Sequence, residues 1–379
     1  MNILYITRHY PPEISGGARR PYLYVKALRE LGNKVTVVTP FELDDPNSIT
    51  VYDAALSNNK YTAVKESNNF LIRFYNFIKV KIVTWSRWPD PNIKWVNKVI
   101  KKVKKSHLKP DWIITTSPPE SIHAAGAKLS KALNASWLAE FRDTWINFPH
   151  REELSTSAFR RYIEKKIAKK YLKHANVLTC VSEEVFNDIK TYAKQHTPYL
   201  IVPHFSDKKN AKYDFNNNGI NLVHTGGFTL SDRRRNIQPL LEKLNLAYDH
   251  NKNLVLHIAG SLTKSEESML RKSRIKTLYH GPVSLDKSRA MQISADGLIL
   301  CTPQNAHALP GKYAEYVTTN KPIYYTGSGN WLNLVYEKSS IFPIEELSEI
   351  KNSQLFNNRN IVTDMEAAKA LNKFLKKNS

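Results

Sequence analysis

The fold is decided by residues 3–40, ILYITRHYPPEISGGARRPYLYVKALRELGNKVTVVTP. This stretch begins with a short apolar strand (3–7) and continues through a loop that holds two adjacent glycines. It then passes into an amphipathic helix that we expect to start at Pro21 and to stop at Gly32. A second apolar strand (34–40) follows at once. A strand, a helix and a further strand in this order predict a unit of parallel sheet covered by helices.

The same alternation continues through the first half of the chain. Apolar runs occur at WIITT (112–116), SWLAEF (136–141), VLTCVS (177–182) and YLIVP (199–203). Strands that are apolar along nearly their whole length are typical of parallel sheets buried on both faces. The first half therefore predicts one doubly wound α/β domain.

A polar, Asn- and Lys-rich stretch at 204–219 resembles an interdomain linker, and the alternation restarts after it. At 379 residues the chain exceeds the usual size of a single core, so two domains are expected. We predict a first Rossmann-like domain at 1–204 and a second at 205–362. A last helix within 363–379 would pack back across the domains.

Composition indicates a cytoplasmic protein. Cys180 and Cys301 both lie in apolar runs, which predicts buried thiols rather than a disulfide or a metal site. No run of about 20 apolar residues is present that could cross a bilayer. The first residues, MNILYITRHYPP, do not have the layout of a signal peptide.

The formal net charge of +22 is the most unusual bulk property. Such an excess attracts polyanions, namely nucleic acids, anionic lipid surfaces or phosphorylated substrates. Basic and aromatic residues concentrate in two stretches, 73–109 and 159–174, with roughly helical spacing. This pattern favours peripheral attachment to an anionic membrane, and the alternative is a solvated face of a Lys-rich protein.

The first candidate binding element is the glycine pair Gly16 and Gly17, after the first strand. In open parallel sheets ligands bind beyond the carboxyl ends of the strands. Adjacent glycines let backbone N–H groups approach an anion near the start of a helix. The pair is not part of a G-x-G-x-x-G motif, which disfavours a nicotinamide or flavin dinucleotide. The alternative is an ordinary turn.

The second element is HTGG, 224–227, with Gly226 and Gly227 again directly after a strand. An arginine run that ends at Arg235 follows before the next helix. A guanidinium group can grip phosphate with two hydrogen bonds, which suits a diphosphate. A solvated charge run is the alternative.

The third element is LPGKYAEYVTTNKPI, 309–323, in which Lys312 and Glu315 lie three residues apart on one helix face. Lysine is a phosphate partner, and a carboxylate can accept both hydroxyls of a ribose. Taken in isolation, the two residues would form a surface salt bridge. Asp143, in EFRDTW after a strand, is a further candidate, and its alternative role is to cap a following turn.

These segments together resemble glycosyltransferase family 4, a group of retaining enzymes with the GT-B fold. The likeness spans nearly the whole chain and includes SPPESIHAAGAKLSKALNASWLAEFRDTW, 117–145. It implies two facing Rossmann-like domains with a cleft between them. The amino-terminal half would receive the acceptor, and the carboxyl-terminal half would hold the nucleotide sugar.

The resemblance also implies residue roles. Gly16 and Gly17 would adjoin the donor phosphates, Arg235 and Lys312 would neutralise the leaving diphosphate, and Glu315 would hold the nucleotide ribose.

Asp143 would lie against the donor sugar. One position departs from the family: His307 stands where members commonly carry a second Glu, eight residues before Glu315. A branch with P-G-K in this element often lacks that Glu, so the departure bears on how the sugar is held.

We therefore expect a retaining hexosyltransferase that needs no metal and no resident cofactor. The favoured donor is a UDP-sugar, and the acceptor is a glycan on a polyprenyl diphosphate. The setting would be surface-polysaccharide, O-antigen or capsule synthesis at the inner membrane face. Asp44 and Asp45 are interpreted as solvated rather than metal-binding. The alternatives are a nucleotide-sugar epimerase or hydrolase of the same fold and, from another class, a basic nucleic-acid-binding protein.

Overall fold

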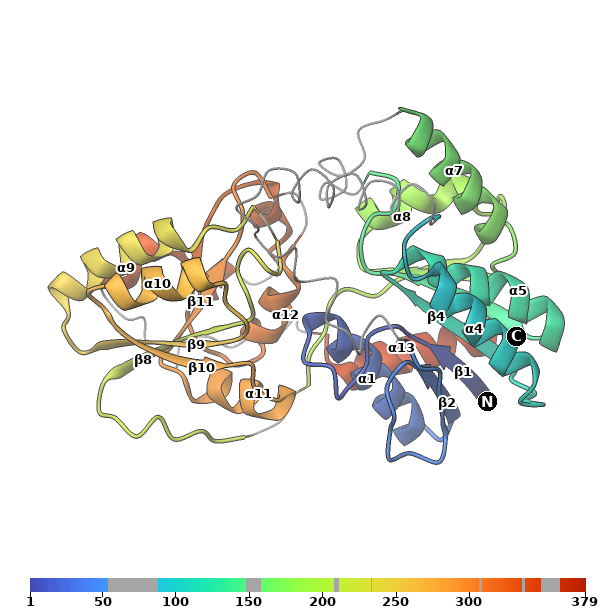
Figure 1. The fold of residues 1–379 in the computed structure, drawn as a ribbon, viewed down its shortest axis with the longest axis horizontal. Helices are drawn as coiled ribbons and strands as arrows, with labels where there is room; N and C mark the ends of the chain where they lie inside the picture. The colour runs from blue at the N-terminus through green and yellow to red at the C-terminus, as the bar shows by residue number, and fades with distance from the viewer. Residues whose placement is uncertain are drawn as a thin grey trace, which may run out of the picture. The chain divides into compact units, whose positions relative to one another are not determined.

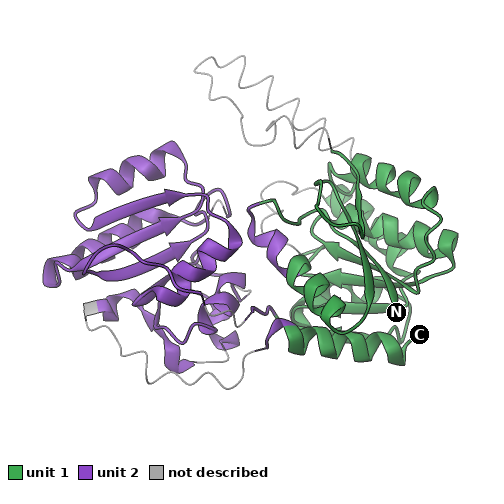
Figure 2. Ribbon diagram, turned by 90° about the horizontal axis from the view of Figure 1, so that it is seen from below, with its two compact units in different colours: residues 1–13, 21–203, 365–379 green, residues 14–20, 204–364 purple. Residues whose placement is uncertain are grey.

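The computed structural model describes residues 1–53, 88–147, 158–207, 211–232, 234–306, 309–335, 338–348 and 362–379. The chain divides into two compact units (Figure 2). Unit 1 comprises Met1–Glu13, Pro21–Pro203 and Met365–Ser379. Unit 2 comprises Ile14–Arg20 and His204–Asp364, so a short segment from the start of the chain clusters with the second half.

Unit 1 is built on a parallel sheet in the order β3-β2-β1-β4-β5-β6-β7, of which β1, β2 and β4 are labelled in Figure 1. Tyr5 in β1 pairs with Val37 on one side and with Ile114 on the other. The strands are β1 (Asn2–Ile6), β2 (Lys34–Thr39), β3 (Ser48–Thr50), β4 (Trp112–Ser117), β5 (Ser136–Phe141), β6 (Val177–Cys180) and β7 (Tyr199–Ile201).

The helices of unit 1 follow from this strand order. The chain crosses from β3 to β4 and on to β7 in one direction, and right-handed crossovers then put the connecting helices on one face of the sheet. Accordingly, α4 packs against α5, and α5 packs against α7. The helices of the unit are α1 (Gly16–Glu30), α4 (Ile93–Lys104), α5 (His123–Leu133), α7 (Ala158–Leu172), α8 (Glu183–Ile189) and α13 (Asp364–Lys377), with short 3₁₀ turns η1 (Glu120–Ile122) and η2 (Lys190–Tyr192).

Large aromatic side chains fill the core of unit 1. Two of the buried tryptophans donate a hydrogen bond from the indole N–H. The indole N–H of Trp95 donates to the Val51 carbonyl at 2.7 Å, and that of Trp137 donates to Thr115 Oγ1 at 2.8 Å. Both indoles are almost fully buried. A buried indole needs such a partner because an unmatched polar group would cost stability.

Unit 2 has a second parallel sheet, in the order β10-β9-β8-β11-β12-β13. Leu222 in β8 pairs with Leu256 on one side and with Gly297 on the other. The strands are β8 (Ile220–Thr225), β9 (Leu254–Ala259), β10 (Lys276–Gly281), β11 (Gly297–Cys301), β12 (Ile323–Thr326) and β13 (Ile341–Pro343). The helices are α9 (Ile237–His250), α10 (Lys264–Lys272), α11 (Leu285–Ser294) and α12 (Gly311–Val317), with 3₁₀ turns η3 (Asn330–Leu334), η4 (Lys338–Ser340) and η5 (Ile344–Ser348).

The prediction of two doubly wound parallel-sheet domains is confirmed, and so are the buried thiols of Cys180 and Cys301. One local expectation was wrong, and one strand was missed. The first helix begins at Gly16 rather than at Pro21, so the glycine pair lies in its first turn and the proline lies inside it. The short strand β3 was not predicted at all.

The stretch interpreted as an interdomain linker begins where the two units divide, and its first residues are partly buried. Phe205, Ser206 and Asp207 are buried, and the backbone of Ser206 bridges to Thr363. Polar composition alone did not reveal this burial, because the Asp207 carboxylate has cationic partners from distant parts of the chain.

The last helix, α13, belongs with unit 1 from Met365 onward. It buries Ala367, Ala368, Leu371 and Leu375 along one side. Beyond its end, Ser379 Oγ accepts a hydrogen bond from the Trp112 indole at 3.0 Å. Among the described residues, no helix combines the length and the apolar character needed to cross a bilayer.

Candidate functional site

The predicted glycine turn after β8 is tightly constrained. Gly226 has a φ of +121°, and its N–H donates to the Ala259 carbonyl at the end of β9 at 2.8 Å. A Cβ on Gly260 would lie 2.1 Å from the Gly226 carbonyl oxygen, so the two backbones touch where no side chain could fit. The carboxyl ends of β8 and β9 are thus joined by glycine backbone, at the edge of the sheet where ligands of parallel sheets bind.

Lys312 lies over this turn. Its Cε would be 3.6 Å from a Cβ built on Gly226. Its Nζ donates to Glu315 Oε2 at 2.9 Å, one helical turn along α12. The two residues do form a salt bridge, and it is largely buried, with side chains 24% and 8% exposed.

The Glu315 carboxylate is held ionised. Burial by itself would raise its pKa, but Lys312, Arg19 and the hydrogen bonds from Lys312 and Gln292 lower the pKa to about 2. All of these donors approach the same oxygen, Oε2. Lys312 Nζ lies at 2.9 Å, Gln292 Nε2 at 3.0 Å and Arg19 Nη1 at 3.8 Å. No hydrogen bond from the described residues reaches Oε1 of this buried carboxylate.

A buried network of charges that sequence reasoning missed supports Glu315. Arg19 Nη2 donates to Asp207 Oδ1 at 2.5 Å and to Ser206 Oγ at 3.0 Å. Arg289 Nη1 donates to the Glu315 carbonyl at 2.7 Å, and its Nη2 donates to the Asp207 carbonyl at 3.0 Å. The contributors come from the first helix, from the expected linker and from α11, so no local motif could have revealed them.

The chemistry of this network is ionic even though it is buried. Burial and the neighbouring Arg19 lower the pKa of Arg289 to about 10, against the opposing effect of Asp207 and Glu315. Arg289 therefore remains a cation at neutral pH. Two guanidinium groups and one lysine thus surround two carboxylates, so both buried anions have cationic partners and the network keeps one excess positive charge.

Arg235, at the end of the predicted arginine run, has a guanidinium Nε without a hydrogen-bond partner among the described residues. Its neighbour Arg234 is held by Asp232, with Nη2 at 3.1 Å from Oδ2, and Arg233 lies outside the described residues. Arg235 is half-buried, and its Nε is buried. A buried donor without a partner is costly unless a ligand or water meets it.

His224, in the same HTGG segment, was not singled out from the sequence. Its Nδ1 donates to the Ile299 carbonyl at 3.0 Å, and its ring stacks on Phe228 at 4.3 Å between centroids. Burial lowers the pKa of His224 to about 4, so the ring is neutral. Its Nε2 is then a buried acceptor that no described residue contacts by a hydrogen bond.

Gly16 and Gly17 cluster with unit 2, the unit that contains the residues above. A Cβ on Gly16 would meet nothing within 4 Å. Gly16 therefore has open space where a side chain would stand. Its predicted contact with donor phosphates stays a prediction.

Asp143 belongs to unit 1, where it follows β5 and is half-buried. The loop after it is fixed by one buried carboxylate, Asp188 of α8. This side chain accepts the backbone N–H groups of Trp145 at 2.7 Å, Ile146 at 2.9 Å and Asn147 at 3.0 Å. The loop that carries Asp143 is thus rigidly positioned, and its contact with the donor sugar stays a prediction.

Other sequence candidates lie apart from this set. His307 lies outside the described residues. Asp45 is not simply solvated, because it pairs with Arg29 at 2.7 Å, whereas Asp44 is exposed. The described residues contain no group of three or more His, Cys, Asp or Glu side chains arranged to hold a metal.

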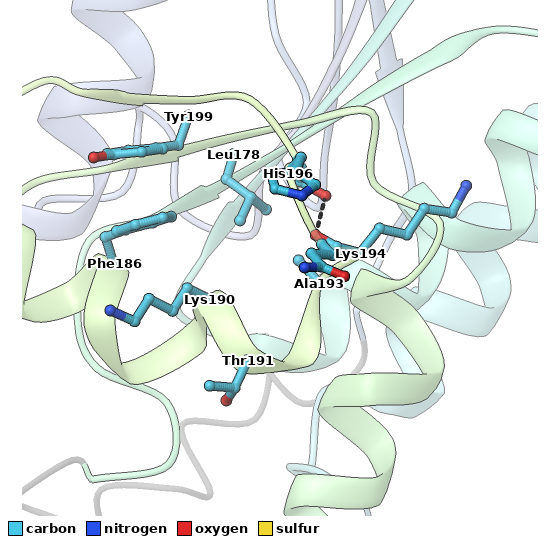
Figure 3. A pocket seen from close by; sticks show the side chains of 10 residues that line it. Leu178, Phe186, Lys190, Thr191, Ala193, Lys194, His196 and Tyr199 are labelled. Carbon is cyan, nitrogen blue, oxygen red and sulfur yellow. Dashed lines mark hydrogen bonds between the residues drawn. The ribbon is translucent and has the colours of Figure 1, made fainter.

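A pocket of about 510 Å³ in unit 1 contains none of the predicted residues (Figure 3). It lies at the amino-terminal ends of β6 and β7, with Leu178 at its base and the stacked rings of Phe186 and Tyr199 on one side. The centroids of these rings are 3.7 Å apart. Ligands of parallel sheets bind at the opposite, carboxyl-terminal edge, so this pocket is not part of the candidate site.

Comparison with known proteins identifies the fold. No protein-family model matches the sequence, and no curated protein matches it. Solved structures match along the whole chain. Anabaena HepE in complex with UDP and glucose is 12% identical, covers 100% of this chain and 97% of its own, and gives a TM-score of 0.54. Sucrose-phosphate synthase from Thermosynechococcus elongatus is 13% identical, covers 99% of this chain and 98% of its own, and gives a TM-score of 0.63.

Two further matches share the fold. WaaG, a glycosyltransferase involved in lipopolysaccharide biosynthesis, is 14% identical, covers 99% of this chain and 95% of its own, and gives a TM-score of 0.56. A putative UDP-N-acetylglucosamine 2-epimerase from Listeria monocytogenes is 10% identical, covers 99% and 96%, and gives 0.58. The chain therefore has the two-domain GT-B fold, which glycosyltransferases and this epimerase-type protein share.

Proposed function

We propose that the protein is a glycosyltransferase that takes a sugar from a nucleoside-diphosphate donor bound by unit 2. The observation that carries the proposal is Lys312 lying over the Gly226 turn beside the ionised Glu315. A cation next to open backbone suits a diphosphate. An adjacent carboxylate with one unoccupied oxygen suits a pair of ribose hydroxyls.

The proposed division of labour follows the partners of each group. Lys312 and Arg235 neutralise the charge that develops on the leaving diphosphate, and Arg235 brings the Nε that lacks a partner among the described residues. Glu315 Oε1 accepts from the ribose. Gly16 and Gly17 adjoin the phosphates, and Asp143 lies against the donor sugar.

The proposed reaction retains the anomeric configuration. The bond between the anomeric carbon and the diphosphate oxygen breaks, and the acceptor oxygen bonds to that carbon on the same face. The acceptor proton passes to an oxygen of the departing diphosphate. Lys312 and Arg235 would supply the charge stabilisation, so the proposed mechanism uses no metal and no resident cofactor.

The donor we favour is a UDP-sugar, because HepE was solved with UDP and glucose. The sugar itself, expected to be a hexose, depends on groups such as His307. A thermal-shift screen across UDP, GDP, TDP, CMP and ADP sugars tests the base. Stabilisation by a donor other than a UDP-sugar would overturn this part of the proposal.

The acceptor we propose is a glycan carried on a polyprenyl diphosphate, in the assembly of a surface polysaccharide, O-antigen or capsule. The likeness to WaaG supports a lipopolysaccharide-type setting. The protein would then work in the cytoplasm, peripheral to the inner face of the membrane. Transfer of radiolabelled sugar into a lipid-extractable product is the direct measurement.

A second candidate activity is epimerisation or hydrolysis of a nucleotide sugar, which the match to the Listeria protein favours. The two activities differ in what they need. An epimerase or hydrolase converts the UDP-sugar without an acceptor, whereas a transferase releases UDP at a useful rate only when acceptor is present. Acceptor-independent conversion at full rate would replace the transferase proposal.

The site residues are tested by substitution with a matched control. Arg235→Ala and Lys312→Ala should each lower turnover at least about 100-fold, the usual effect of losing one donor to a developing charge. Arg234→Ala is the control, since Arg234 is the adjacent arginine and is bound to Asp232. Near-normal turnover in the first two variants, with native melting profiles, would remove both residues from the site.

A further inference from the structure

Three helices of unit 1 form one continuous layer. The crossovers that follow β3, β4 and β5 all run in the same direction across the sheet, so α4, α5 and α7 lie side by side on one face (Figure 1). Direct packing joins α4 to α5 and α5 to α7. Segments from separate parts of the sequence therefore share one outer surface.

That outer surface, which we call the basic face, carries positive charge alone. The acidic residue within the three helices is Glu164, which is buried and bonded to Arg160 at 3.3 Å. The charge changes sign at the edge of the layer, where α8 begins with exposed Glu183 and Glu184. The exposed residues of the basic face are Lys94, Lys98, Lys101, Lys102 and Lys104 of α4, Lys128 and Lys131 of α5, and Arg161, Lys165, Lys166, Lys169 and Lys170 of α7.

Aromatic side chains are exposed at one end of the basic face. Phe159 and Tyr162, in the first turns of α7, are 56% and 52% exposed. They lie on the side of the helix that also carries Lys166 and Lys170, opposite the buried Ala168. The ammonium group of Lys166 lies 4.4 Å from the centre of the Tyr162 ring.

We propose that the basic face is a docking surface for an anionic lipid bilayer. Lysines around exposed aromatic rings are the composition of helices that lie in the headgroup region of a membrane. Arginine, which grips individual phosphates with two hydrogen bonds, is represented by Arg161 alone. A layer of helices that exposes many lysines and one arginine therefore fits a lipid surface better than it fits a nucleic acid.

This inference rests on the proposed transfer to a lipid-linked acceptor, and it names the surface that brings unit 1 to the membrane. It differs from the sequence-based expectation in two respects. Lys128 and Lys131 of α5 lie outside both basic stretches, yet they fill the space between them. The basic face is also complete without residues 73–87, which lie outside the described part of the chain.

The test is sedimentation with vesicles of phosphatidylcholine, with and without phosphatidylglycerol. The test variant carries Lys101→Gln, Lys131→Gln and Lys169→Gln, one substitution on each helix. Each lysine near an anionic surface contributes about fivefold to binding, from about 1 kcal/mol per residue. The triple variant should therefore bind anionic vesicles about 100-fold more weakly than the wild type.

The matched control carries Lys264→Gln, Lys272→Gln and Lys276→Gln, three exposed lysines of unit 2 that lower the net charge equally. It should bind like the wild type. Equal weakening in both variants would mean that net charge rather than the basic face drives binding, and would overturn the proposal. So would binding to an oligonucleotide that is tighter than binding to vesicles.

A second variant, Phe159→Ser with Tyr162→Ser, tests the aromatic end. It should lose the part of vesicle binding that survives high salt, and unchanged salt-resistant binding would contradict the proposed insertion. Binding of free UDP, measured by calorimetry, separates the two proposals. If UDP binds while vesicles do not, the docking surface fails and the transferase proposal stands. If vesicles bind through the basic face and UDP does not bind, the transferase proposal fails and the docking surface stands.

Discussion

Replacing Glu315 with glutamine should show how much the ionised carboxylate contributes to the free energy of unfolding. The pKa of Glu315 is about 2 in the folded protein, against an ordinary value of 4.5. One pKa unit corresponds to about 1.4 kcal/mol, so this difference contributes about 3 kcal/mol to the free energy of unfolding at neutral pH. Glutamine preserves the shape of the side chain but leaves Lys312 without its countercharge, whereas Arg19 keeps its ion pair with Asp207.

The expected result is a variant about 3 kcal/mol less stable than the wild type at pH 7, measured by urea denaturation followed by circular dichroism. The sign of the pH dependence is fixed by the direction of the shift. A carboxylate with a lowered folded pKa stabilises the protein above pH 4.5, and this stabilisation is lost as the pH falls towards 2. The difference between wild type and variant should therefore be constant from pH 7 to about 5 and should shrink to about 1 kcal/mol at pH 3.

A double-mutant cycle with Lys312→Met isolates the pair. The two substitutions together should cost less than the sum of their separate effects, because removing both partners leaves no unpaired charge between them. A difference below about 1 kcal/mol at pH 7, or one that does not shrink at low pH, would refute the view that Glu315 is an ionised structural anchor.

The same variant separates anchoring from binding. If Oε1 holds the ribose, losing a charged hydrogen bond worth about 1.5–3 kcal/mol should weaken UDP about 10- to 100-fold by calorimetry. Gln292→Leu is the control, because Gln292 donates to Oε2 and leaves Oε1 untouched. An unchanged affinity in Glu315→Gln would restrict the carboxylate to its structural role.

Two further predictions concern the glycine pair and acid stability. Gly16→Ala should leave the melting temperature unchanged or slightly raised, because the site has open space and alanine favours a helix; if phosphates approach this backbone, UDP affinity should fall, and unchanged affinity would remove Gly16 from the site. Burial lowers the pKa of His123 to about 3 and the pKa values of His224 and His257 to about 4. The unfolded chain therefore takes up protons below pH 6.5 that the folded chain refuses, so the unfolding free energy should fall from pH 6.5 towards 4, by up to about 1.4 kcal/mol per pH unit for each histidine. A flat urea midpoint across that range would contradict the buried neutral state of these rings.

Most strands of the two sheets could be predicted from the sequence because they are largely apolar. Runs such as SWLAEF and GLILC contain little that a solvated loop would use, and parallel strands buried on both faces require that composition. The start of the first helix could not be located this way. Pro21 is a common first residue of a helix, whereas here the helix already begins at Gly16 and contains the proline.

The candidate site was predictable only where its residues lie close together in one local motif. Gly226 and Gly227 lie directly after β8, and Lys312 and Glu315 lie one turn apart on α12. Asp207 could not be found, because an aspartate in a polar stretch is ordinarily solvated. Its burial depends on Arg19 and Arg289, which are distant in sequence and carry no local signal of pairing.

The segment Ile14–Arg20 connects the two elements on which the proposed donor site in unit 2 rests, the glycine pair and the Lys312–Glu315 pair. It comes from the beginning of the chain, yet it clusters with the unit that contains Glu315. Arg19 explains this placement, because its guanidinium group bonds to Asp207 and lies 3.8 Å from the Glu315 carboxylate. Gly16 lies one helical turn before Arg19, on the same short stretch of α1. The glycine pair and the Lys312–Glu315 element, which the sequence separates by almost 300 residues, are therefore tied to one buried ionic network. A ligand that engages both would be bound within a single compact unit, which is the physical reason to propose that the phosphate and ribose contacts belong to the same donor.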